Sequence, residues 1–301
     1  MTRRVLLTGG AGFVGSHLTR ACLREGWQVG VIYQPQAGLS QIEDIRAKIC
    51  AYPVNGTIED VISIVERFQP DLVFHLASVF LAQHSSADIL TLINSNIAFG
   101  SQILEAMVCY NVPYFINTGT SWQHYQDGDY NPVNLYAAAK QAFEDILEYY
   151  VQARRVRAIT LKLFDTYGPA DPRQKLFHVL ARTAIEGSRL EMSPGEQLID
   201  LVYIDDVVTA FLVAAKRLFG GQVPGHDRYA VSSGKPVCLR DLIEIYQRVT
   251  GQTLDIVWGG RHYREREVML PWSRGERLPG WEPVVGLEEG IKRIMEKMID
   301  E

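Results

Sequence analysis

Cysteines, long apolar runs and an excess of either charge are all scarce in this 301-residue chain. The four cysteines stand far apart, with neither the spacing of a disulfide framework nor that of a metal site. No stretch approaches the roughly 20 apolar residues that span a bilayer. The first apolar run, residues 5–7, is too short for a signal peptide. These absences predict a soluble, cytoplasmic protein with no bound metal ion and no membrane partner.

A basic surface stripe is also missing. The chain has 30 lysines and arginines against 35 aspartates and glutamates, which gives a net charge of -5. Arg3-Arg4 and Arg154-Arg155 are isolated basic pairs. Nucleic-acid-binding proteins cluster positive charge on one face, because they must neutralise phosphates. We therefore expect no nucleic-acid partner.

What the first half does contain is a regular alternation of short apolar runs and helical periods. Strands separated by crossover helices indicate βαβ units and a parallel sheet, and near-continuous apolar strands indicate that both faces are covered. We predict an α/β fold with a Rossmann-type, doubly wound parallel sheet. The expected strands cover residues 5–7, 28–33, 72–76, 114–117 and 158–163, and the expected helices cover 13–25, 58–68, 88–108 and 135–150.

The rhythm changes after Pro169, where proline and glycine interrupt the segments more often. We predict that residues 1–168 form the domain that contains this sheet and that residues 169–301 mainly form a smaller lobe. Segments at about 200–218 are expected to return to the first domain. No linker-like segment separates the two, so they are expected to share a cleft.

A glycine-rich loop, Thr8-Gly-Gly-Ala-Gly-Phe-Val-Gly15, lies between the first predicted strand and the first predicted helix. Gly9 permits a tight turn, Gly12 lets the backbone approach a pyrophosphate, and Gly15 lets the helix pack closely on the strand. The helix amides and dipole then favour an anion. The loop predicts dinucleotide binding, so residues 1–168 are the expected NAD(P)-binding domain and residues 169–301 are expected mainly to bind the substrate.

The second strand predicts which dinucleotide is bound. An NAD site usually offers an acid at the end of this strand for the ribose hydroxyls. Here the strand ends in Tyr33-Gln34-Pro35, without an acid or an arginine. A 2′-phosphate would meet no repulsion, and Gln34 and Ser40 could donate hydrogen bonds to it. NADP(H) is favoured, and NAD(H) stays possible.

The pair Tyr136-xxx-Lys140 places two side chains on one face of a helix for which Asn134 is the expected N-cap. A free tyrosine, with a pKa of about 10, is a poor acid–base catalyst at neutral pH. We expect the Lys140 ammonium and a cationic nicotinamide to lower the pKa of Tyr136. Thr120 follows the strand at 114–117 and is the expected partner that hydrogen-bonds the substrate oxygen.

In order along the chain, these motifs resemble the extended short-chain dehydrogenases/reductases, the NAD-dependent epimerase/dehydratase family. The resemblance also rests on four further segments: Thr118-Gly-Thr120, Leu163-Phe-Asp-Thr-Tyr-Gly-Pro169, Tyr203-Ile-Asp-Asp-Val207 and Leu278-Pro-Gly-Trp-Glu-Pro283. The run Pro194-Gly-Glu-Gln197, leading to Tyr203–Val208, is similar to CDP-abequose and CDP-paratose synthases. Those bacterial enzymes reduce the 4-keto group of a CDP-deoxyhexulose with NADPH and serve polysaccharide (lipopolysaccharide) biosynthesis.

The resemblance implies a set of site residues. The catalytic set is Thr120, Tyr136 and Lys140. The implied cofactor-binding residues are Gly9, Gly12, Phe13, Val14, Gly15, Gln34, Ser40, Thr57, Ile58, Leu76, Ala77, Ser78, Thr118, Tyr136, Lys140, Leu163 and Thr166. The implied substrate-binding residues are Phe80, Thr120, Trp122, Asp165, Lys175 and Arg264. Asn96 falls where the family has a helix asparagine of structural role, and a homodimer formed by helices 88–108 and 135–150 is implied as well.

Two departures from the family pattern affect the diphosphate site. Asp165 replaces a frequent asparagine, and an acid beside a diphosphate is unfavourable unless it is paired or points away. Ile199 stands where many relatives carry an arginine.

Two histidines are also candidates for a role: His75 is expected to be a satisfied core residue, whereas His124, with Trp122, either lines the sugar pocket or is structural.

The expected reaction is NADPH-dependent reduction of the 4-keto group of a CDP- or dTDP-linked deoxyhexulose. The alternative is an NAD-dependent 4-epimerase with the same triad, since stereochemistry depends on how the ring turns in its pocket. A 4,6-dehydratase is disfavoured because Ser121-Trp122 replaces the acid pair after the threonine, and Cys109 precedes the strand, unlike the cysteine of reductive 3,5-epimerases. A non-catalytic nucleotide sensor is disfavoured because Thr120, Tyr136 and Lys140 are all retained.

Overall fold

The computed structural model describes residues 2–300, and the side chains of residues 2–297. Seven strands form one sheet in the order β11-β6-β5-β4-β1-β2-β3. Every pairing between these neighbours is parallel, which confirms the predicted sheet. The strands are β1 (Arg4–Thr8), β2 (Gln28–Tyr33), β3 (Cys50–Pro53), β4 (Leu72–His75), β5 (Tyr114–Thr120), β6 (Arg157–Leu163) and β11 (His226–Val231).

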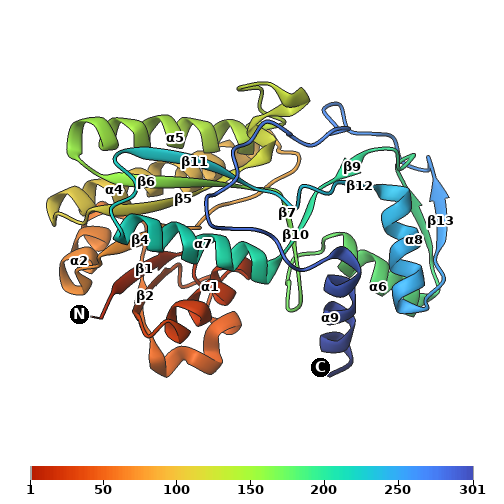
Figure 1. Cartoon of the computed structure of the whole chain (residues 1–301), viewed down its shortest axis with the longest axis horizontal. Coiled ribbons are helices and arrows are strands. Elements are labelled where there is room, and N and C mark those ends of the chain that lie inside the picture. The colour runs from red at the N-terminus through yellow and green to blue at the C-terminus, as the bar shows by residue number, and fades with distance from the viewer. Residues whose placement is uncertain (1, 301) are drawn as a thin grey trace.

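Helices cover both faces of this sheet (Figure 1). One face carries α1 (Phe13–Arg24), the 3-10 helix η1 (Ser40–Lys48) and α7 (Ile204–Phe219), and the other carries α2 (Ile58–Phe68), α4 (Phe99–Cys109) and α5 (Leu135–Arg154). Successive side chains of β1 alternate between the two cores: Val5 and Leu7 pack with α1 and α7, and Leu6 packs on the other face. Because both sides are buried, the strands read as continuous apolar runs.

The helix predicted at 88–108 is interrupted. The structure has the 3-10 turn η2 (Ser86–Asp88), the short helix α3 (Ile89–Ile93), a π-helical turn η3 (Asn94–Ala98) and then α4. Such π turns are often found at functional sites. This one buries Asn96, whose amide group accepts from the Val79 nitrogen at 3.0 Å and donates to the Val79 oxygen at 2.9 Å.

The second half of the chain contributes more to the sheet than its sequence indicated. Residues 204–219 form α7, which packs on the sheet, and β11 joins the sheet beside β6. Neither β3 nor η1 was predicted. The division into domains at residue 168 stays a prediction.

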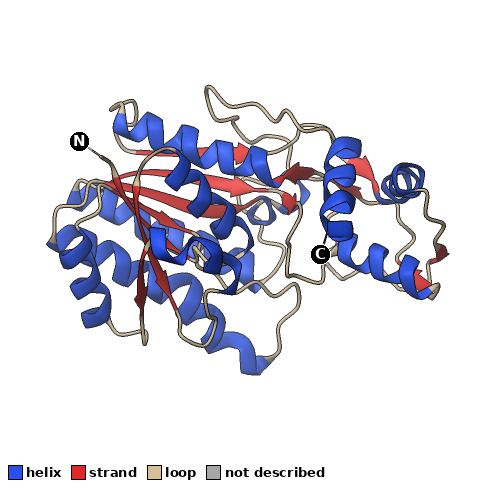
Figure 2. Cartoon of the chain, turned by 90° about the horizontal axis from the view of Figure 1, so that it is seen from below, coloured by secondary structure: helices blue, strands red, loops and turns tan. Residues whose placement is uncertain are grey.

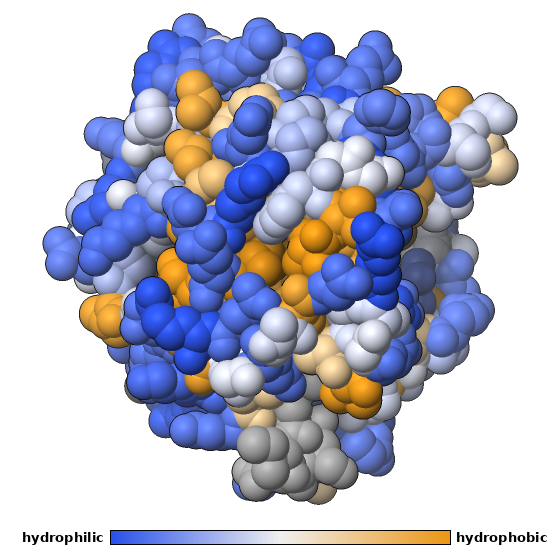
Figure 3. Space-filling model, turned by 90° about the vertical axis from the view of Figure 1, so that its right-hand side faces the viewer, coloured by the Kyte–Doolittle hydropathy of each residue, from blue (hydrophilic) through white to orange (hydrophobic). Residues whose placement is uncertain are grey.

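The remaining elements form a smaller lobe at the other end of the molecule (Figure 2). Its core lies between α6 (Leu176–Glu186), α8 (Leu239–Thr250) and α9 (Leu287–Asp300). Three small two-stranded sheets complete it: β7 (Asp165–Tyr167) with β10 (Leu201–Tyr203), β8 (Arg189–Met192) with β13 (Asp255–Trp258), and β9 (Leu198–Ile199) with β12 (Val237–Cys238). From this end, apolar side chains gather near the middle of the face and hydrophilic ones surround them (Figure 3).

Within the part of the chain that the structure describes, no helix combines the length and the apolar character needed to cross a bilayer. On the helices expected to form a dimer, Ile89, Leu90 and Tyr149 are exposed. The dimer itself stays a prediction.

Candidate active site

The glycine loop turns between β1 and α1, next to the end of β4. Chain order reverses between β1 and β4, and in such sheets ligands bind at the carboxyl ends of the strands at this switch point. Gly9 has a positive φ of 68°, and a methyl group there would lie 2.6 Å from the Ala77 amide nitrogen. At Gly15 a methyl group would overlap the Gly9 carbonyl oxygen. At Gly12 it would meet no protein atom closer than 3.3 Å, which leaves room for a ligand at the start of α1.

A buried polar contact ties the ends of β1 and β4 together. The Thr8 hydroxyl lies 2.8 Å from His75 Nδ1 and accepts from the Ala77 nitrogen at 3.2 Å. Burial lowers the pKa of His75 to about 3, so the ring is neutral. His75 was expected to be a satisfied core residue. It is fully buried, but among the described residues its Nε2 has no partner.

Tyr136 and Lys140 lie in the first turns of α5. Asn134 is the N-cap, as predicted: its side chain accepts from the Ala137 nitrogen at 2.9 Å. Lys140 is 2 % exposed and its Nζ lies 5.9 Å from the centre of the Tyr136 ring. Burial lowers the pKa of Lys140 to about 8. Lys140 makes no hydrogen bond or ion pair with any other described residue, so its ammonium fits a ligand hydroxyl such as that of a cofactor ribose.

The lowered pKa expected for Tyr136 includes the effect of a cationic nicotinamide and stays a prediction; the protein alone shifts this pKa in the opposite direction. Burial raises the pKa of Tyr136 to about 12, and the Ser78 hydroxyl and the charge of Arg173 offset only part of that rise. Desolvation of the phenolate therefore outweighs the charges around it. Without a bound ligand, Tyr136 is a protonated phenol at neutral pH, which suits a proton donor.

The predicted partner Thr120 ends β5 and is mostly buried. Its hydroxyl accepts from the Trp122 nitrogen at 3.3 Å and caps the 3-10 turn η4 (Ser121–Gln123). The adjacent Ser121 lines a large cavity between the sheet and the smaller lobe, and Thr120 does not line it. No residue in the described part of the chain hydrogen-bonds the Ser121 hydroxyl. The sequence singled out Thr120 and gave Ser121 no role of its own.

A cavity of about 900 Å³ lies between the carboxyl edge of the sheet and the smaller lobe. Five of the predicted substrate residues line it: Phe80, Trp122, Asp165, Lys175 and Arg264. Tyr136 and Lys140 do not line the cavity, but the ring of Phe80, which does, contacts both Tyr136 and the cavity residue Trp122. Its centre lies 5.0 Å from that of Tyr136 and 5.5 Å from that of Trp122.

Charges in the cavity wall are partly paired. Asp165, the acid that the sequence flagged, lies 3.6 Å from the ammonium of Lys175, and Arg264 lies 3.8 Å from Glu267. Arg261 lines the same cavity as Ile199 and adds a guanidinium where Ile199 offers none. The wall therefore combines apolar surface with charged side chains of both signs, since Asp171, Glu191 and Asp200 line it as well.

Arg173 is a cavity residue that the sequence analysis missed. Its guanidinium lies 4.5 Å from the centre of the Phe13 ring, donates to the Thr166 carbonyl at 3.1 Å and is held by Asp171 at 2.6 Å. It therefore lies beside Phe13 at the end of the glycine loop, and its positive charge lowers the pKa of Tyr136. An arginine in a loop after Pro169 matches no spacing rule, so nothing in the sequence marked it.

The other predicted cofactor residues are dispersed along the sheet edge. Gln34 and Ser40 are exposed after β2, and Thr57 caps α2 by accepting from the Asp60 nitrogen at 3.3 Å. The Thr118 hydroxyl is buried, with no partner among the described residues. Roles of three further residues stay predictions: Ile58 begins α2, Leu163 ends β6 and Thr166 lies in β7.

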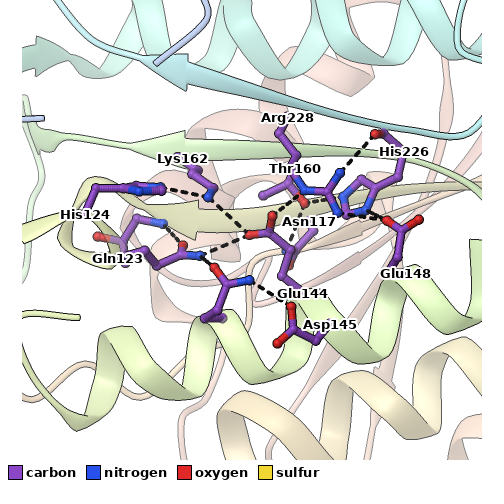
Figure 4. Close-up of polar contacts among 12 residues, drawn as sticks. Asn117, Gln123, His124, Glu144, Asp145, Glu148, Thr160, Lys162, His226 and Arg228 are labelled. Atoms are coloured by element: carbon purple, nitrogen blue, oxygen red, sulfur yellow. Dashed lines mark hydrogen bonds and ion pairs between the residues drawn. The ribbon is translucent and has the colours of Figure 1, made fainter. Parts of the chain in front are cut away.

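Beneath the turn η4 lies a buried polar network (Figure 4). The Glu144 side chain, on α5, is 1 % exposed. It accepts from Gln123 at 3.0 Å and from Arg228 at 2.6 Å, and lies 3.6 Å from the Lys162 ammonium. Burial would raise the pKa of Glu144, but Lys162, Gln123 and Arg228 hold it below its ordinary value. The carboxylate is therefore ionised in the core.

His124 joins this network to the cavity. Its Nε2 accepts from the Lys162 ammonium at 2.8 Å, and its Nδ1 lies 3.0 Å from the Gly128 oxygen. Burial and the charge of Lys162 lower its pKa, so the ring is neutral. The ring stacks on Trp272 at 3.9 Å, and both residues line the cavity. The open choice for His124 is thus resolved: it lines the cavity and also has a structural role.

No group of three or more histidine, cysteine, aspartate or glutamate side chains that could hold a metal ion was found within the described ranges. The predicted roles of the catalytic, cofactor and substrate residues stay predictions.

Comparison with known proteins gives consistent matches. A model of the NAD dependent epimerase/dehydratase family matches residues 5–229. The chain is 29% identical to a CDP-abequose synthase of Yersinia pseudotuberculosis, over 89% of this chain and 91% of that protein. It is 23% identical to a CDP-abequose synthase of Salmonella typhimurium, over 98% of each. A solved structure of Thermotoga maritima UDP-glucose 4-epimerase with UDP-glucose is 25% identical, covers 98% of both chains and has a TM-score of 0.86.

Proposed function

Since the chain belongs to the NAD-dependent epimerase/dehydratase family of extended short-chain dehydrogenases/reductases, we propose that this NAD(P)-dependent enzyme reduces the 4-keto group of a nucleotide-activated deoxyhexulose. The proposed substrate is linked to CDP or dTDP, and NADPH is the proposed reductant. The two CDP-abequose synthases, which match nearly the whole chain, support this choice.

The observation that carries the proposal is the Tyr136 phenol beside the buried Lys140, next to a cavity whose wall includes lysine and arginine side chains. When bound, the reduced nicotinamide supplies a hydride to the carbonyl carbon. The Tyr136 phenol then gives its proton to the forming alkoxide oxygen, and the pKa of about 12 keeps that proton in place until it is needed. The Lys140 ammonium favours the negative charge that remains.

We propose that Ser121 presents the hydroxyl that orients the carbonyl, and that Thr120 fixes the turn. Ser121 lines the cavity, whereas the Thr120 hydroxyl is used as a cap. The sequence assigned the orienting role to Thr120. The distinction is testable, because the two side chains are adjacent but differ in what they contact.

The cations in the cavity wall are proposed to bind the diphosphate of the substrate. Lys175 begins α6 at its N-cap position, and Arg264 and Arg261 lie across the cavity from the sheet edge. Binding of this remote part of the substrate aligns the sugar ring and lowers the barrier entropically. The pairing of Lys175 with Asp165 limits the charge that it offers.

A 4-epimerase is the second candidate. The Thermotoga maritima 4-epimerase shares the fold over nearly the whole chain, and the same Tyr136–Lys140 pair would serve a hydride that returns to the opposite face of the sugar. Such an enzyme is redox-neutral and retains its cofactor.

One experiment separates the two candidates. The purified protein is denatured and any released cofactor is measured; NADPH and NADH are then titrated, with CDP- and dTDP-4-keto-6-deoxyglucose as oxidants. A reductase has an empty site and oxidises NADPH only when a 4-keto sugar is present. Near-stoichiometric bound NAD(H) with no consumption of added NADPH would reject the reductase and favour the epimerase.

A further inference from the structure

We propose that Glu144 is a positioning residue that acts through two chains of contacts, its two arms. One arm, through Gln123, fixes the turn at residues 120–124 that follows β5. The other, through Lys162 and His124, fixes Trp272 in the cavity wall. The first arm is expected to control kcat and the second to control KM. The inference rests on the proposed function and extends it to residues remote from the reacting atoms.

The first arm is a chain of buried hydrogen bonds. The Glu144 carboxylate accepts from Gln123 Nε2 at 3.0 Å, and Gln123 Oε1 accepts from the Thr120 nitrogen at 2.9 Å. Gln123 is fully buried, and a second acceptor, Gln141, lies 2.7 Å from its Nε2. Its amide therefore has one orientation that satisfies all three contacts. The backbone that presents the Thr120 and Ser121 hydroxyls is fixed from below by α5.

The second arm reaches the opposite side of the same turn. The Lys162 ammonium lies 3.6 Å from Glu144, donates to His124 Nε2 at 2.8 Å and lies 5.6 Å from the centre of the Trp272 ring. Trp272 is stacked on His124 at 3.9 Å and is parallel to the ring of Phe164, whose centre is 6.3 Å away. A displaced His124 would therefore shift the aromatic wall of the cavity.

Two features make Glu144 the centre of this arrangement. It lies four residues after Lys140, one helical turn along α5, so the helix that carries Tyr136 and Lys140 also carries the anchor. The space for both arms exists because residue 119 is glycine: a methyl group there would lie 2.9 Å from Gln123 Oε1 and 3.0 Å from Lys162 Cγ. The Glu144 carboxylate therefore links α5 both to Gln123 in the turn and, through Lys162, to His124 (Figure 4).

The neighbouring Glu148 provides a matched control. It contacts Arg228 at 2.8 Å and His226 at 3.0 Å, on the same side of α5, but it reaches neither Gln123 nor Lys162. A change at Glu148 disturbs the periphery of the network and leaves both arms intact.

The test compares Gln123→Met, Lys162→Met and Glu148→Gln by steady-state kinetics with NADPH and CDP-4-keto-6-deoxyglucose, and by equilibrium binding of CDP-glucose. Displacement of an aligned group costs roughly ten- to a hundredfold. Gln123→Met should lower kcat about tenfold with little change in KM. Lys162→Met should raise KM and the Kd of CDP-glucose about tenfold and leave kcat within about threefold. Glu148→Gln should match the wild type.

The proposal is overturned if Lys162→Met and Gln123→Met alter kcat and KM in the same proportion, or if Glu148→Gln has an equal effect. Should Lys162→Met fail to fold, His124→Phe replaces it: the ring still stacks on Trp272 but cannot accept from Lys162, and the same rise in KM is expected. Should the wild type not reduce the keto sugar, the proposed function fails. Binding of CDP-glucose then still decides the second arm, since Lys162→Met must weaken it and Gln123→Met must not.

Discussion

The cofactor end and the cavity end of this molecule are built in different ways. At the cofactor end, the glycine loop, β1 and α1 are consecutive in sequence, and close backbone contacts at Gly9 and Gly15 shape the site. At the cavity end, the wall consists of loops from both halves of the chain, held by side chains. Asp127 accepts from the Ser273 nitrogen at 2.8 Å, and Arg266 donates to Asn131.

The difference shows where specificity can vary. A backbone cradle depends on a few glycines and tolerates little change, so it suits a cofactor shared by a whole family. A wall of loops and side chains can change residue by residue without altering the sheet. We therefore expect changes at the cofactor end to act on binding of any nicotinamide cofactor, and changes at the cavity end to act on the choice of sugar nucleotide.

The largest effect is expected from Tyr136→Phe, at the boundary between the two ends. The variant keeps the ring against Phe80 but loses the proton donor, so kcat should fall about 10²- to 10⁴-fold. Tyr149→Phe, at an exposed position on the same helix, is the control and should match the wild type. NADPH oxidation with a 4-keto sugar measures both. A Tyr136→Phe variant with more than about a tenth of wild-type kcat would contradict the proton-donor role.

The next effect separates two adjacent hydroxyls. Ser121→Ala should lower kcat about 10²- to 10³-fold, because an oriented donor to the carbonyl is lost. Thr120→Val should change kcat much less but lower the free energy of unfolding by about 1 kcal/mol, since a capping group is removed. For both variants, steady-state kinetics measure kcat and urea denaturation measures the free energy of unfolding. The reverse pattern would return the orienting role to Thr120.

Gly15→Ala tests whether the glycine loop binds the cofactor. The added methyl group overlaps the Gly9 carbonyl oxygen, so the loop must open. The Kd of NADPH should rise at least about tenfold, and unfolding should become easier by about 1–3 kcal/mol. Gly286→Ala, where a methyl group meets nothing within 4 Å, is the matched control. Equal NADPH binding by Gly15→Ala and the wild type would refute the placement of the pyrophosphate.

The pH dependence of reduction should follow Lys140. Its pKa of about 8 means that the ammonium is present below pH 8 and is lost above it. The rate of reduction should therefore be level below pH 8 and fall by up to about tenfold per pH unit above it. Tyr136, with a pKa of about 12, adds no change in that range. A profile of kcat/KM from pH 6 to 10 that stays flat would exclude a role for the Lys140 charge.

The smallest effect is expected at the cavity end. Asp165→Asn removes a negative charge beside Lys175 and leaves its ammonium available to a diphosphate. Because the pair is partly exposed, the gain should be modest, with CDP-glucose bound roughly two- to fivefold more tightly. Calorimetric titration measures it. Weaker binding by Asp165→Asn would show that the carboxylate itself contacts the substrate.

Much of the sheet and the cofactor end could be predicted from the sequence, because local patterns determine them. The apolar runs gave five of the seven strands of the main sheet, and the motif spacing gave the glycine loop and the pair Tyr136–Lys140. The short strand β3 has mixed burial and no clear period. The strand β11 lies in a part of the chain where proline and glycine obscured the pattern.

The rest depends on contacts that no local pattern contains. The sequence could not show that Ser121, rather than Thr120, faces the cavity, since the two are adjacent and differ only in the conformation of the turn. Nor could it show that burial outweighs the charges around Tyr136 and raises its pKa. No motif marks Glu144 or Lys162 in the sequence, and they form an ion pair only because the fold brings α5 onto β6.

The contacts between residues 124–131 and 266–274 also affect the order in which parts of the protein fold during synthesis. The bond from Ser273 to Asp127 joins residues 146 positions apart, and β11 pairs with β6 across more than sixty residues. Contacts between such distant segments form late and slow the folding of a chain. A nascent polypeptide can thus complete its nucleotide cradle while still on the ribosome. The loop at residues 124–131 therefore acquires these contacts only once residues 266–274 have been synthesised.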